Sequence, residues 1–142
     1  MTLRAALVLL LWPAMACADI CSDLRDLVDH AEGGDFQISQ IEIAAGTPEC
    51  SVSQDERGGR TTLCFWTFAY RDTAATTAFE RLDQDVRRCF SDATILPADS
   101  TVNHPDSYQL RRYQRGRLVI SVSLKDKAAL SQSLVFLRID RQ

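Results

Sequence analysis

The sequence predicts an α+β fold in which two helices pack on one face of an antiparallel sheet. Two segments repeat their apolar residues with the helical period, and six segments read as strands, four of them with an alternating or continuous apolar pattern. Connections between neighbouring strands are short, which favours antiparallel pairing with the helices on one side of the sheet. We expect the order α-β-β-β-α-β-β-β in a single domain that spans residues 19–142.

The two helices are expected at residues 19–32 and 73–90, where an apolar stripe lies opposite charged residues. Gly33 and Gly34 supply the end of the first helix. Its stripe consists of Ile20, Leu24, Leu27, Val28 and Ala31. The stripe of the second helix consists of Ala75, Ala78, Phe79, Leu82, Val86, Cys89 and Phe90.

Three strands are expected between the helices. Residues 36–43 alternate as a strand with a bulge near Gln40, and residues 50–54 form a weak strand. Residues 55–59 have the composition of a turn. Residues 61–70 form the strongest strand, and their apolar residues fall on both faces, which predicts a central position in the sheet.

Three more strands are expected after the second helix. Residues 91–106 contain two prolines and show no periodicity, so we expect an irregular loop there. Residues 107–114 and 117–124 read as a hairpin, and the second of these strands alternates apolar residues with polar or small ones. Residues 132–140 are again apolar on both faces, which predicts a second central strand.

Residues 1–18 have the organisation of a secretory signal peptide, with Arg4 before a short apolar run and Ala16 and Ala18 at the cleavage site. The run is too short to span a bilayer. We therefore expect a bacterial periplasmic or secreted protein without a transmembrane segment in its mature chain. Two alternatives stay open, a buried N-terminal helix and a lipoprotein acylated at Cys17.

The mature chain would keep an even number of cysteines, which is typical of disulfide bonds in an exported protein. These are Cys21, Cys50, Cys64 and Cys89. If residues 55–59 form a hairpin loop, Cys50 lies opposite Cys64, and the other pair joins the two helices. We favour Cys50–Cys64 and Cys21–Cys89, with the other two connectivities left open. Redox catalysis is disfavoured because no two cysteines have the C-x-x-C spacing.

No catalytic signature is present, and the chain has two histidines, His30 and His104. His30 ends the first expected helix, where a cation suits the helix dipole. Asp29, His30 and Glu32 could bind a metal, but their spacing fixes no geometry. His104 precedes Pro105, in a sequence that favours a turn. We expect no metal and no cofactor, and lean away from an enzyme.

Charge divides the mature chain into an acidic and a basic part. Residues 19–56 contain ten acidic residues and one arginine, whereas residues 57–142 contain nine acidic and fourteen basic residues. The densest basic stretch lies on the expected hairpin, together with tyrosines, and these side chains suit carboxylates, phosphates or protein surfaces. The candidate binding residues are Tyr108, Arg111, Arg112, Tyr113, Arg115 and Arg117. Alternatively, the hairpin pairs with the acidic first helix of the same fold. Nucleic acid is not an expected partner of an acidic exported protein.

These observations predict a small, non-catalytic periplasmic binding or inhibitor-type protein. It would recognise an envelope or secreted protein, or an anionic ligand, through the hairpin. Two alternatives are a small secreted hydrolase that uses carboxylates and His104, and a structural accessory subunit of an envelope complex.

Overall fold

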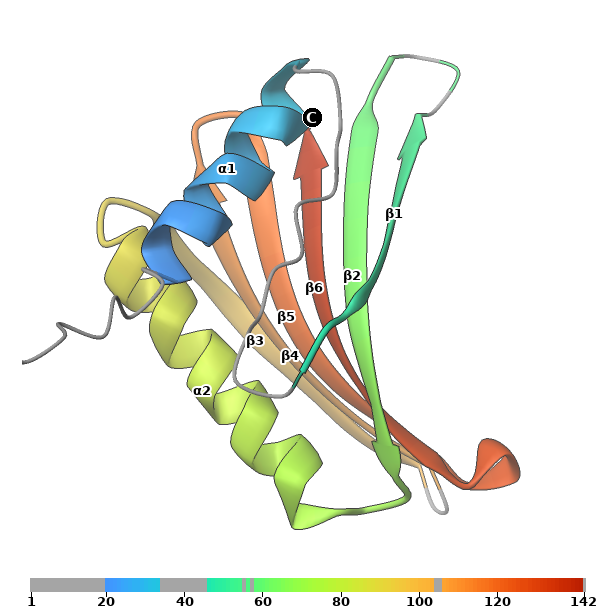
Figure 1. Cartoon of the computed structure of the whole chain (residues 1–142). Helices are drawn as coiled ribbons and strands as arrows, with labels where there is room; N and C mark the ends of the chain where they lie inside the picture. The colour runs from blue at the N-terminus through green and yellow to red at the C-terminus, as the bar shows by residue number, and fades with distance from the viewer. Residues whose placement is uncertain (1–19, 34–45, 55, 57, 104–105, 142) are drawn as a thin grey trace, which may run out of the picture.

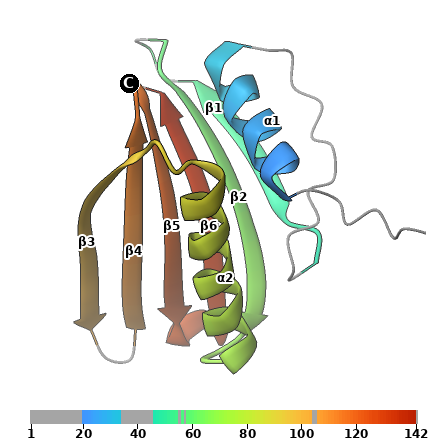
Figure 2. The same cartoon turned by 90° about the vertical axis from the view of Figure 1, so that its left-hand side faces the viewer.

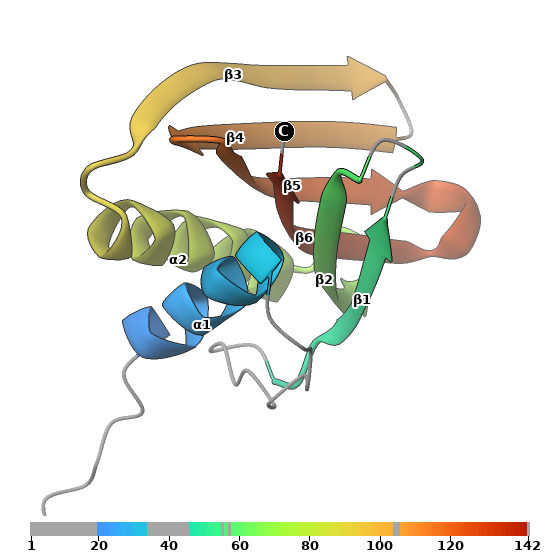
Figure 3. The same cartoon turned by 90° about the horizontal axis from the view of Figure 1, so that it is seen from above.

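Six antiparallel strands form one sheet that curves around two helices (Figure 3). The computed structural model describes residues 20–33, 46–54, 56, 58–103 and 106–141. The helices are α1 (Ile20–Gly33) and α2 (Thr73–Cys89), with a short 3-10 turn, η1 (Ala128–Leu130). The strands are β1 (Glu49–Gln54), β2 (Arg60–Ala69), β3 (Thr94–Asn103), β4 (Asp106–Arg115), β5 (Leu118–Lys127) and β6 (Gln132–Arg141).

The strands lie in the order β1-β2-β6-β5-β4-β3, so β6 and β5 occupy the centre of the sheet. Both helices lie on the same face of the sheet (Figures 1 and 2). Within the described residues, no helix or strand covers the opposite face, which we call the open face. This arrangement separates the side chains of each strand into a helix-facing set and an open-face set.

The core lies between the helices and the sheet. On β5, Leu118, Ile120, Val122 and Leu124 alternate toward the helices and are buried. The apolar stripes of α1 and α2 meet them, as the helical period requires. The largest fully buried side chains are Tyr113, Phe79, Leu24, Leu82, Leu118, Ile120, Leu137, Ile139, Val28, Val86, Val122 and Val135.

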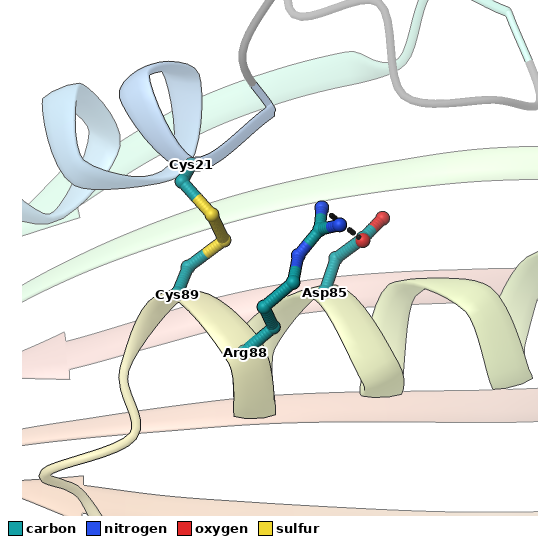
Figure 4. The surroundings of a disulfide bond; sticks show 4 residues. All are labelled: Cys21, Asp85, Arg88 and Cys89. Carbon is teal, nitrogen blue, oxygen red and sulfur yellow. Dashed lines mark hydrogen bonds and ion pairs between the residues drawn. A yellow bond between two sulfur atoms is a disulfide. The ribbon is translucent and has the colours of Figure 1, made fainter.

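Local interactions fix the ends of α2. The carboxylate of Asp72 accepts a hydrogen bond from the N–H of Ala74 (2.9 Å), which caps the first turn. Arg87 and Arg88 lie in the last turn, where cations suit the helix dipole. Arg88 also pairs with Asp85 at 2.9 Å on the helix surface (Figure 4). The helix therefore begins and ends where the sequence predicts, within one residue.

Two disulfide bonds join the cysteines in the favoured pairing. Cys21 bonds Cys89 and ties the start of α1 to the end of α2 (Figure 4). Cys50 bonds Cys64 between β1 and β2, where the two residues lie directly opposite each other in the register. The hairpin argument thus placed the second pair correctly, because Gln54 and Arg60 pair at the end of the hairpin and set this register.

The predicted irregular loop at residues 91–106 is wrong. Residues 94–103 form strand β3, so four strands follow α2, one more than expected. Pro97 had argued against a strand here, because proline cannot donate a hydrogen bond to a neighbouring strand. The structure accommodates Pro97 at the edge of the sheet, within a bulge between Leu96 and Asp99.

Some of the sequence predictions fall on residues that the structure does not describe. The expected signal peptide at residues 1–18, the expected strand at residues 36–43 and His104 lie outside the described residues. Within the described part of the chain, neither helix has the length and apolar composition needed to cross a membrane.

Candidate functional site

The candidate site is the open face, because its central strands carry apolar side chains there too. These side chains come from β2, β4 and β6 and are half-buried: Leu63, Phe65, Leu110, Leu134 and Phe136. The rings of Phe65 and Phe136 lie 5.9 Å apart between their centres. A sheet face that is exposed to solvent and contacts no other protein normally carries polar side chains. Apolar side chains gathered on an uncovered face are typical of a contact surface.

A hollow of about 260 Å³ lies in the middle of the open face. Its position follows from the small side chains of Ser121 and Ser123 on the central strand β5. Longer side chains flank these serines, since Ser123 lies between Leu110 of β4 and Phe136 of β6. The hollow is lined by Leu63, Tyr108, Leu110, Ser121, Ser123, Lys125, Phe136, Arg138 and Asp140.

Lys125 closes one end of the hollow, between two aromatic rings. Its ammonium nitrogen lies 5.3 Å from the ring centre of Tyr108 and 5.1 Å from that of Phe136. Both distances are those of cation–π contacts, which hold a cation without neutralising it. Among the described residues, no carboxylate forms an ion pair with Lys125. Its full charge is therefore available to an anionic group.

Two arginines lie toward the other end of the hollow, and they differ in their partners. Arg138 is paired with Asp140 (2.8 Å), which also accepts a hydrogen bond from the hydroxyl of Thr61 (2.7 Å). Arg112 lies across from Ser121 in the register and donates one hydrogen bond to the carbonyl of Pro97 (3.3 Å). Its Nε is buried and has no hydrogen-bond partner in the described structure. Arg112 is thus the second cation of this face without a carboxylate, again within the described residues.

Tyr108 lies among these charges. Burial raises the pKa of its hydroxyl, and the charge of Asp99 raises it further, whereas Arg112 and Arg138 lower it. The same tyrosine therefore contacts Lys125 through its ring and lies within electrostatic reach of both arginines. Lys125 thus contacts the ring of Tyr108, whereas the two arginines act on its hydroxyl through their charges.

The structure divides the six predicted binding residues among the two faces of the sheet and the turn between β4 and β5. Tyr108 and Arg112 belong to the open face. Tyr113 is 2 % exposed and lies in the core. The guanidiniums of Arg111 and Arg115 lie over the rings of Phe79 and Phe90, each at 5.7 Å, on the helix side. Arg117 is exposed in the turn between β4 and β5.

Arg115 has a further partner on the helix side. Its Nε bonds the carboxylate of Asp92 at 2.9 Å, and this contact lowers the pKa of Asp92. The alternative that the hairpin pairs within its own fold therefore applies to Arg115, although the acid follows α2 rather than lying on α1. A surface made of all six predicted residues does not exist, because alternate residues of a strand point to opposite faces.

The sequence contains signals for the residues that the prediction missed. Ser121, Ser123 and Lys125 occupy alternate positions of β5, on the face opposite the buried apolar side chains of that strand. Leu63 and Phe136 belong to the two strands that are apolar on both faces. With helices on one side only, one apolar face of each central strand had to remain uncovered, and this inference would have pointed to the open face.

A cluster of hydroxyls and a carboxylate lies on the helix side at the far end of the sheet. Ser107 and Ser133 each donate to Asp126 at 2.5 Å, and the N–H of Arg71 donates to the hydroxyl of Ser133 (2.8 Å). Each serine proton is therefore committed to the carboxylate, and no described histidine is bonded to either serine. These contacts hold the β2–α2 connection against the sheet.

The described residues contain no group of three histidine, cysteine or acidic side chains that could hold a metal ion. No protein-family model matches this chain, and no curated protein matches its sequence.

Proposed function

We propose that this chain is an exported, non-catalytic binding protein that holds a protein partner on the open face of its sheet. The observation that carries the proposal is the hollow at Ser121 and Ser123, with half-buried apolar walls and Lys125 at one end. Arg112 lies on the same face, across from Ser121 in the register. Aromatic and arginine side chains are enriched at protein interfaces.

The size of the hollow favours a protein over a small molecule. Pockets for drug-sized ligands are about 300–1,000 Å³ and bury most of the ligand. The hollow, at about 260 Å³, lies on an open sheet face and is smaller than that range. A volume of this size suits one large side chain, as in an anchor residue at the centre of an interface.

Export is supported by the disulfides, which persist in oxidising compartments. Residues 1–18 act as the signal peptide in this proposal, and residues 19–142 form the mature domain. The protein then works in the bacterial periplasm or outside the cell.

The test compares two variants of the mature protein as bait in an envelope extract of the source cells. Leu63→Asp/Leu110→Asp places charges in the walls of the hollow. The matched control, Ile95→Asp/Leu130→Asp, changes two apolar residues that are 64 % and 61 % exposed elsewhere. Thermal unfolding verifies that both variants fold.

Quantitative mass spectrometry should show a protein that wild type and the control retain in a constant ratio and the open-face variant loses. Equal recovery of every protein with both variants would remove the proposal.

A further inference from the structure

We infer that the open face binds an extended segment of its partner, in which an apolar anchor residue stands between two acidic residues. This inference rests on the proposed function and names the chemistry of the bound segment. The evidence for it is the hollow and the positions of Lys125 and Arg112, which form no ion pair with a carboxylate among the described residues.

The hollow determines which side chain of the partner can serve as the anchor. Its walls are the side chains of Leu63, Leu110 and Phe136, and its floor is formed by small serines. A phenylalanine or leucine side chain of the partner can enter between these walls and remove apolar surface of both proteins from water.

The positions of Lys125 and Arg112 determine the charge and spacing of the residues on either side of the anchor. Lys125 and Ser121 are four residues apart on β5, and Arg112 lies across from Ser121. Four residues of a strand span about 13 Å. In an extended peptide, side chains two positions before and after the anchor lie on the same side and about 13 Å apart. Acidic residues at these positions would therefore meet Lys125 and Arg112 while the anchor fills the hollow.

The acidic groups of the face restrict where the segment lies. Asp140 forms an ion pair with Arg138, so the charges of these two residues cancel at the centre of the face. Asp99 lies on β3 across from Leu110 and repels an acidic segment from that edge. The charges thus favour a segment that runs over β5, between Lys125 and Arg112.

The experiment measures fluorescence anisotropy of a short labelled peptide with a central phenylalanine, serines beside it and aspartates two positions to either side. One comparison peptide carries asparagine for both aspartates, and another carries alanine for phenylalanine. The protein variants are Arg112→Gln, Lys125→Gln and Ser121→Leu, which fills the hollow. Controls are Arg81→Gln on the exposed side of α2 and Ser91→Leu at an exposed position after it.

We expect Arg112→Gln and Lys125→Gln each to weaken binding of the aspartate peptide about fivefold, with little effect on the asparagine peptide. Ser121→Leu and the alanine peptide should each weaken binding more than tenfold. Arg81→Gln and Ser91→Leu should bind as wild type does, and added salt should reduce the preference for aspartate.

Four results would overturn the inference: no binding of the aspartate peptide, equal binding of the aspartate and asparagine peptides, wild-type binding by Ser121→Leu, or a dimer in sedimentation that Ser121→Leu dissociates. The last result would mean that a second copy of the chain occupies the face. If the peptide fails but Leu63→Asp/Leu110→Asp still loses its partner from the extract, the inference falls and the proposed function stands. Unchanged recovery from the extract would remove both.

Discussion

The hydroxyl of Tyr113 donates a hydrogen bond to the carboxylate of Asp83, and thereby joins β4 to α2 inside the protein. Both residues are buried, with 2 % and 5 % of their surface exposed. Arg87, one turn along α2, donates to the same hydroxyl (2.8 Å) and pairs with Asp83 at 3.2 Å. A buried carboxylate needs such partners, because an unpaired one would be strongly unfavourable.

Tyr113→Phe should therefore destabilise the protein, although it removes only one oxygen atom. Asp83 would lose its buried donor, and we expect the free energy of unfolding to fall by about 1–3 kcal/mol in urea titrations at pH 7. Tyr108→Phe is the matched control on the open face and should cost less than about 0.5 kcal/mol. Equal losses for the two variants would contradict a stabilising role of the Tyr113–Asp83 bond.

The same bond predicts a loss of stability at alkaline pH. Burial, followed by the bond to Asp83, raises the pKa of Tyr113 from 10.0 to about 12, although Arg87 opposes the shift. Between these values the unfolded tyrosine releases its proton and the folded one keeps it, so stability falls as pH rises. The contribution is fully present below pH 10, and roughly 2–3 kcal/mol is lost by pH 12. Stability curves of wild type and Tyr113→Phe should converge over this interval, and parallel curves would contradict the assignment.

The elements with a clear period were predictable from the sequence. Both helices were predicted within one residue at each end, and the strand at residues 132–140 matches β6 closely. β3 was not predictable by period, because an edge strand needs neither alternation nor a donor at Pro97. Its place is fixed by pairing with β4, a contact between strands that no local pattern reveals.

The binding surface was predictable only in part, for a physical reason. The strand that contains Arg111, Arg112 and Tyr113 is polar on both faces, so its own pattern cannot show which residues turn toward the helices. Tyr113 enters the core because Asp83 and Arg87 satisfy its hydroxyl there. That pairing depends on how α2 packs on the sheet, and only the tertiary structure provides it.

The two disulfides should contribute unequally to stability. Cys21 and Cys89 are 68 residues apart in sequence, whereas Cys50 and Cys64 are 14 apart. In the chain-entropy model, closing the longer loop contributes about 4 kcal/mol and the shorter about 3 kcal/mol. Cys21→Ala/Cys89→Ala should therefore lower the free energy of unfolding more than Cys50→Ala/Cys64→Ala, and removing both bonds should unfold a domain of ordinary stability.

Urea titrations of the two double variants measure this difference. Intact mass should also rise by about four hydrogens on reduction, since each disulfide takes up two. A free thiol in the oxidised protein, or a larger loss for the shorter loop, would oppose the prediction.

Apolar residues of the open face should stabilise the fold far less than those of the core. Phe79 is fully buried, and Phe79→Ala should cost about 3–5 kcal/mol because it leaves a cavity. Leu110 is half-buried beside the hollow, and Leu110→Thr keeps strand propensity, so it should cost less than about 1 kcal/mol. Urea titrations measure both values. A small loss at Leu110 together with weakened peptide binding would mean that the leucine serves the interface, because its effect on folding cannot explain the binding. A loss as large as that of Phe79→Ala would instead make the open face part of the stabilising core, and its apolar side chains would then need no partner.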